Sequence, residues 1–181
     1  MARGFIVQPR SGTAIRALAH QTLDWLSFQG RRVQILHLIE NVLPQLDDTF
    51  SFEVLDHADM ERRYGFAAEG MTVHRDNLIA LRTDVYRGAL DGNGRHRFTA
   101  AHELGHYVMH KDEGLSFPRK TGPDAKVYVD SEWQADCYAR ELLADLRFCG
   151  RFDAPFTVAT HFQVSQQVAE IQWKAAKKMA Q

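Results

Sequence analysis

The sequence has only two cysteines, no long apolar run and almost no net charge. Cys137 and Cys149 both fall in apolar helical patterns, so we interpret them as small buried side chains of a reducing compartment, not as a disulfide framework. No segment approaches the roughly 18 apolar residues of a membrane span, and the first residues contain no apolar core suited to a signal peptide. We therefore expect a cytoplasmic protein with no membrane partner.

Charge and size exclude two further classes of protein. The 22 Lys and Arg residues nearly balance the 23 Asp and Glu residues, which leaves a net charge of -1. That balance argues against non-specific adhesion to DNA or acidic membranes as the main activity. With 181 residues, of which 45% are hydrophobic and 25% charged, the chain can bury a globular core without a disulfide or a metal.

The periodicity of apolar residues predicts an α+β fold with a short, mostly antiparallel sheet. Helices are expected over residues 11–30, 33–43 (ended by Pro44), 56–64, 95–110 and 131–143, and strands over 50–54, 71–74 and 77–82. The last two strands flank Arg75-Asp76-Asn77, a sequence suited to an antiparallel hairpin. If the strand ending at Arg82 is an exposed edge, it can bind an extended substrate by β-augmentation.

The chain is expected to divide into a domain over residues 1–150 and a C-terminal helical pair over 151–181. The pair resembles part of a helix-turn-helix, with Ser165 as the cap of its second helix and Lys174, Lys177 and Lys178 able to meet phosphate. Because the segment is short and its charge modest, we favour docking on the core or on a partner protein over contact with DNA.

One motif within residues 95–110 carries chemistry. His102-Glu103-Leu104-Gly105-His106 is an H-E-x-x-H sequence. Helical residues four apart lie on one face, about 6 Å apart along the axis, so both imidazoles can reach one zinc ion. Glu103 projects toward the same side, where it can take a proton from a water molecule without ligating the metal.

A third ligand is needed, and two residues are candidates. His110 lies about 9 Å along the axis from the midpoint of the two histidines, too far for one ion, so we interpret it as a ring near the helix C-terminus that interacts with the dipole. Glu132, on the next helix, would complete the ligand set and leave one position open for water. Asp136 shares its face and can accept the spare ring N–H of a ligating histidine.

The residues around the motif resemble the ImmA/IrrE family of metallo-endopeptidases. The similarity is carried by RFTAAHELGHYVMH (97–110), EWQADCYARELL (132–143) and LIALRTDVYRGA (78–89). It implies a small zincin-like domain of the gluzincin type, with Zn²⁺ held by His102, His106 and Glu132 and with Glu103 as catalytic base. The protein substrate it implies is a cytoplasmic helix-turn-helix repressor, which we expect to be encoded nearby. One departure is Leu-Leu-Ala-Asp-Leu at 142–146, where the family often has Leu-Leu-Met-Pro.

Two functions follow from these residues. The first is a zinc endopeptidase; the second is a regulatory or toxin–antitoxin-like module of the same fold that binds a partner protein or DNA without proteolysis. Glu103 favours the enzyme, because a structural metal site needs no base beside an open coordination position. Tyr128 and His161 are candidate stabilisers of the oxyanion, although packing explains each ring more simply.

Overall fold

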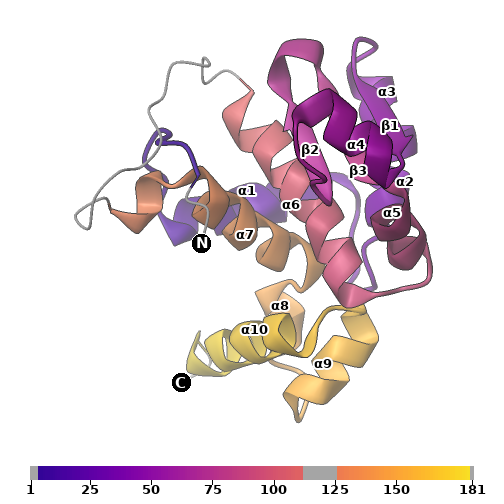
Figure 1. Cartoon of the computed structure of the whole chain (residues 1–181). Helices are drawn as coiled ribbons and strands as arrows, with labels where there is room; N and C mark the ends of the chain where they lie inside the picture. The colour runs from indigo at the N-terminus through magenta and orange to yellow at the C-terminus, as the bar shows by residue number, and fades with distance from the viewer. Residues whose placement is uncertain (1–3, 112–125, 180–181) are drawn as a thin grey trace.

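The structure, a computed structural model, describes residues 4–111 and 126–179 (Figure 1). It confirms the α+β fold: one three-stranded sheet surrounded by helices. Most of the segment between the predicted helices 95–110 and 131–143 lies outside the described residues. Among the described helices, none has the length and apolar character needed to cross a membrane.

The strands and the helices of the described residues are given separately, each in chain order. The strands are β1 (Ser51–Leu55), β2 (Gly70–Val73) and β3 (Leu78–Arg82). The helices are α1 (Gly12–Trp25), α2 (Ile35–His37), the π-helix η1 (Leu38–Val42), α3 (Leu43–Leu46), α4 (His57–Tyr64), the 3₁₀-helix η2 (His74–Asp76), α5 (Thr83–Leu90), α6 (Gly94–His110), the 3₁₀-helix η3 (Val127–Val129), α7 (Ser131–Leu143), α8 (Leu146–Cys149), α9 (Pro155–Phe162) and α10 (Gln166–Met179).

The sheet has the order β1-β3-β2 and is mixed, not mostly antiparallel as expected. β2 and β3 form the predicted antiparallel hairpin, closed by Asn77 in the left-handed conformation, but β1 runs parallel to β3. The expectation that the strand ending at Arg82 is an edge is wrong, because β3 lies in the centre. Its residues Leu78 to Leu81 form a continuous apolar run, and all four are buried. Such a run is typical of a strand that is covered on both faces.

Two helix boundaries differ from those predicted. Pro44 does not end the second helix, which continues as α3; the π-helix η1 precedes it, with Leu43 donating its N–H to the Leu38 carbonyl. The wider turn and the placement of Pro44 in the first turn of α3 accommodate a residue that has no N–H to donate. Helix α1 begins as predicted, with Ser11 as its cap: the Ser11 hydroxyl accepts a hydrogen bond from Ala14 N at 3.1 Å. That helix ends well before Gly30, however, because Ser27 already adopts a left-handed conformation.

Helix α6 lies between the sheet and α7, and this arrangement positions the site (Figure 1). Asn93 caps its start by accepting from the N–H groups of Arg95 and His96. Gly105 lies where α6 meets α7, and a Cβ on it would stand 3.2 Å from the Cα of Ala135. The close approach of the two helices therefore depends on this small residue.

The chain near the N-terminus holds the start of α7. Val7 donates its N–H to the Val129 carbonyl, and Ser131 donates its N–H to the Phe5 carbonyl. Asp130 caps α7 through a hydrogen bond from the Glu132 N–H. The first turn of α7, with Glu132 in it, is thus fixed from two directions.

Between α9 and α10, the C-terminal pair, Gln163 adopts a left-handed conformation. Ser165 accepts a hydrogen bond from the Val168 N–H, as expected of the cap of the second helix. The pair is tied to the rest of the chain, since Arg97 of α6 donates to the Gln163 carbonyl and Lys177 donates to the Gly150 carbonyl. The domain division at residue 150 stays a prediction. Cys137 and Cys149 are buried and free, as expected.

Candidate metal centre

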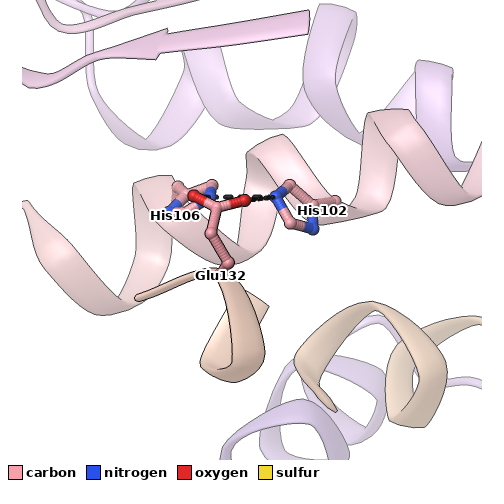
Figure 2. A group of neighbouring side chains, drawn as sticks. All are labelled: His102, His106 and Glu132. Atoms are coloured by element: carbon pink, nitrogen blue, oxygen red, sulfur yellow. Dashed lines mark hydrogen bonds and ion pairs between the residues drawn. The ribbon is translucent and has the colours of Figure 1, made fainter. Parts of the chain in front are cut away.

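Three side chains converge where α6 faces the start of α7, and they form a group able to hold a metal ion. Figure 2 shows the Glu132 carboxylate reaching across to the imidazoles of His102 and His106. The two Nε2 atoms lie 2.9 Å apart, and the carboxylate oxygens lie 3.2 Å from His102 Nε2 and 3.4 Å from His106 Nε2. One ligand atom from each residue falls within 4.8 Å of the others.

The donor set matches a catalytic metal site in both chemistry and spacing. Two imidazole nitrogens and one carboxylate oxygen are the donors of many catalytic zinc sites, which keep a fourth position open. Ligand atoms about 2.0–2.1 Å from a tetrahedral ion stand roughly 3.3 Å from one another, close to the separations seen here. The Glu132 side chain is 46% exposed, so the group opens to solvent on the side of α7.

The electrostatics of the group favour positive charge at its centre. Burial opposes a charged His102, but hydrogen bonds to Asp136 and Glu132 outweigh it and raise the pKa of His102 to about 10. Burial likewise opposes an ionised Glu132, yet hydrogen bonds from both histidines hold the pKa of its carboxyl well below the ordinary value. A field that stabilises an imidazolium also stabilises a bound cation.

Asp136 contacts His102 at the ring nitrogen that does not face the group. Its Oδ1 lies 2.9 Å from His102 Nδ1, one helical turn along α7 from Glu132. An Nδ1–H donated to this carboxylate leaves the lone pair of His102 on Nε2, which faces the group.

Glu103 is not a member of the three-residue group, and its side chain contacts the edge strand β2. Thr72 of β2 donates its hydroxyl to Glu103, with Oγ1 2.8 Å from Oε2 and 2.9 Å from the Glu103 carbonyl oxygen. Gly70, two residues earlier on the same face of β2, leaves room for this side chain. A cavity of about 330 Å³ opens here and is lined by both Glu103 and His102. The Glu103 carboxylate and one member of the three-residue group, His102, therefore border one space.

His110 is buried and contacts His106 directly, although it is not a member of the group. Its Nδ1 lies 3.1 Å from His106 Nδ1, on the side of that ring opposite to Nε2, and its own Nε2 lies 3.2 Å from Gln134 Oε1. Burial, with the nearby His106, lowers the pKa of His110 to about 4. The helix-dipole interpretation did not predict these contacts.

Three residues of this region escaped the sequence analysis: Gly70, Thr72 and Gln134. Gln134, which lies between Glu132 and Asp136 in the sequence of α7, is fully buried. A polar residue on the buried face of a helix is the signal that could have identified it. A glycine in a strand, such as Gly70, often marks a close approach of another group.

The two proposed oxyanion stabilisers lie in different surroundings. Tyr128 of η3 is 39% exposed, and the Lys126 ammonium lies 5.7 Å from the centre of its ring. His161 of α9 lies against Phe152 and Phe162, with its Nε2 2.7 Å from the Gly30 carbonyl oxygen. Its contacts are those of a packed ring, whereas the role of Tyr128 stays a prediction.

Comparison with known protein families finds a match over a large part of the chain. The family model described as the IrrE N-terminal-like domain, Peptidase M78, matches residues 66–174, which is more than half of the chain. The matched region contains β2, α6 and α7, and hence every residue of the metal-binding group. No curated protein matches the sequence.

Proposed function

Because the chain belongs to the M78 peptidase family with an IrrE N-terminal-like domain, we propose that it is a zinc-dependent endopeptidase that cuts a helix-turn-helix repressor in the cytoplasm. The family supports a metallopeptidase, and the ImmA/IrrE resemblance suggests the repressor. The observation that most supports an enzymatic function is the shared cavity. It is lined by Glu103 and His102, and Glu103 is not one of the three proposed ligands.

In this proposal His102, His106 and Glu132 hold the metal and Glu103 moves the proton. A zinc ion there would lower the pKa of water and polarise the scissile carbonyl. The Glu103 carboxylate accepts a proton from the attacking water as the new C–O bond forms, and it delivers that proton to the amine as the C–N bond breaks. The Thr72 hydroxyl holds the carboxylate through Oε2, which leaves Oε1 for the water. Tyr128 is the proposed additional stabiliser of the oxyanion.

The edge strand β2 is the proposed place for the substrate backbone. It pairs with β3 on one side only, within the described residues, and it borders the cavity. An extended peptide added to the free edge would run past Glu103 and His102. The corrected strand order thus transfers the expected β-augmentation from β3 to β2.

The test is cleavage of a purified repressor encoded beside this gene. We expect the zinc-loaded protein to cut it, and the Glu103→Gln variant to keep zinc and fold while its rate falls by about 10²–10⁴-fold. The amide keeps the shape of the carboxylate but cannot accept the proton. Elemental analysis of His106→Ala should show the loss of stoichiometric zinc.

Two results would overturn the proposal. Unchanged cleavage by Glu103→Gln would remove the carboxylate from the mechanism. Zinc-loaded wild-type protein that binds the repressor tightly and never cuts it would instead establish the regulatory alternative, in which the same fold acts by binding.

A further inference from the structure

The orientation of the Gln134 side chain is determined by its neighbours. Its Nε2 lies 2.8 Å from the Gln8 carbonyl oxygen and 2.8 Å from the Tyr128 carbonyl oxygen. Backbone carbonyls only accept hydrogen bonds, so the amide NH₂ group must face them and donate to both. The remaining atom, Oε1, is an acceptor, and it is the atom directed at His110.

That acceptor determines which nitrogen of His110 carries the proton. His110 Nε2 lies 3.2 Å from Gln134 Oε1 and must donate to it, since two acceptors would repel each other. The ring is only 4% exposed, and a neutral imidazole is the form that burial favours. A neutral ring protonated on Nε2 has its lone pair on Nδ1, which faces His106 Nδ1 at 3.1 Å.

We infer that Gln134 and His110 form a hydrogen-bond relay that holds His106 as the Nδ1–H tautomer and so presents its Nε2 lone pair to the metal. His106 Nδ1 has to donate, because the facing nitrogen of His110 accepts. The relay starts at two backbone carbonyls, of Gln8 and Tyr128, and ends at the metal-binding group. His110 and Gln134 are therefore positioning residues, and the inference rests on the metal centre proposed above.

The relay gives the two histidine ligands different supports. His102 donates to the carboxylate of Asp136, whereas His106 donates to a neutral imidazole. Both arrangements direct Nε2 toward the same point, but only the relay reaches residues near the N-terminus and η3. A substitution of His110 is thus expected to weaken metal binding, although His110 is not itself a ligand.

Zinc affinity, measured by competition with a chromogenic chelator, tests the relay. We expect His110→Phe, which fills the same space but accepts no hydrogen bond, to bind Zn²⁺ roughly 10–100-fold more weakly. His110→Asn should retain most of the affinity, because its amide oxygen can occupy the place of Nδ1. His161→Phe is the matched control: it also replaces a packed histidine, and its affinity should equal that of the wild type.

A second measurement does not depend on any variant. The ¹⁵N shifts of the histidine side chains in the wild-type protein should show His110 protonated on Nε2 and not on Nδ1. A proton on His110 Nδ1, or a folded His110→Phe protein with unchanged affinity, would overturn the relay alone. Wild-type protein that binds no Zn²⁺ would refute the metal centre, and the relay with it.

Discussion

Gly70 of β2 lies directly against the side chain of Glu103 of α6: a Cβ built on Gly70 would stand 2.7 Å from Glu103 Cγ. This distance is shorter than any normal contact between carbon atoms. A Cβ at position 70 and the Glu103 side chain therefore cannot both occupy these positions. The small residue on the edge strand thereby sets where the proposed base can lie, although it makes no polar contact with it.

Gly70→Ala should therefore displace Glu103 and leave the zinc ligands in place. A misplacement of about 1 Å can cost about 100-fold in rate, and we expect a loss of that order in repressor cleavage with full zinc content. Gly12→Ala is the control, because a Cβ there meets nothing within 4 Å. Equal cleavage rates for the two variants would show that Glu103 does not depend on the space at Gly70.

Removal of the Thr72 hydroxyl should weaken the same carboxylate position. A hydrogen bond to a charged group contributes about 1.5–3 kcal/mol, so Thr72→Val, which is nearly isosteric, should lower kcat about tenfold or more. Thr72→Ser keeps the hydroxyl and should keep most of the rate. Zinc content measured in parallel separates an effect on Glu103 from damage to the metal site. If the serine variant is as slow as the valine variant, the hydroxyl of residue 72 does not determine the cleavage rate.

Zinc affinity should rise with pH across the neutral range. Burial disfavours the cation, but Asp136 and Glu132 raise the pKa of His102 to about 10, so the metal-free ring holds a proton at neutral pH. A ligating imidazole must be neutral, so binding releases that proton. As long as the pH lies below the raised pKa, the affinity therefore increases about tenfold for each unit by which the pH rises. Chelator competition at several pH values gives the slope.

The Asp136→Asn variant supplies the check on this assignment. Without the carboxylate the pKa of His102 should fall, and the dependence of affinity on pH should flatten at the upper end of the range. A wild-type affinity that does not change with pH would contradict the protonated His102.

Arg97 should contribute to the docking of the C-terminal pair on the core. The residue is 3% exposed, and its guanidinium donates to the carbonyls of Gln163 and Val33, at 3.0 and 2.7 Å. Burial lowers the pKa of this guanidinium to about 10. Arg97→Met leaves both carbonyls without this donor, at a cost of about 1–3 kcal/mol for each buried group. Part of this cost is offset because the methionine no longer buries a charge, so we expect a net loss of about 2 kcal/mol in urea unfolding.

Arg95→Met is the comparison for this variant. Arg95 is an exposed neighbour on α6 that pairs with Glu69, and such surface ion pairs are worth about 0–1 kcal/mol. Hydrogen exchange in α9 should accelerate in Arg97→Met and not in Arg95→Met. Equal stability of the two variants would show that the buried guanidinium adds nothing to the docking.

Short-range geometry made much of the site predictable from sequence. The four-residue spacing of His102 and His106 places them on one helical face whatever surrounds the helix, because the α-helical repeat alone determines it. The same repeat puts Asp136 one turn beyond Glu132. The starts of the predicted helices at Ser11 and Asp56 were predictable for a similar reason, since a capping side chain bonds only to the first turn of its own helix.

Only the tertiary structure decided which surfaces meet. Three features depend on residues that are far apart in the chain: the central place of β3, the close packing of α6 and α7 at Gly105 that brings Glu132 to the histidines, and the fit of Gly70 to Glu103. Periodicity reports which face of an element is buried, but not which neighbour covers it. His110 shows the difference: its distance along the helix argued against its being a ligand, whereas its contact with Gln134 exists only because α6 and α7 pack together.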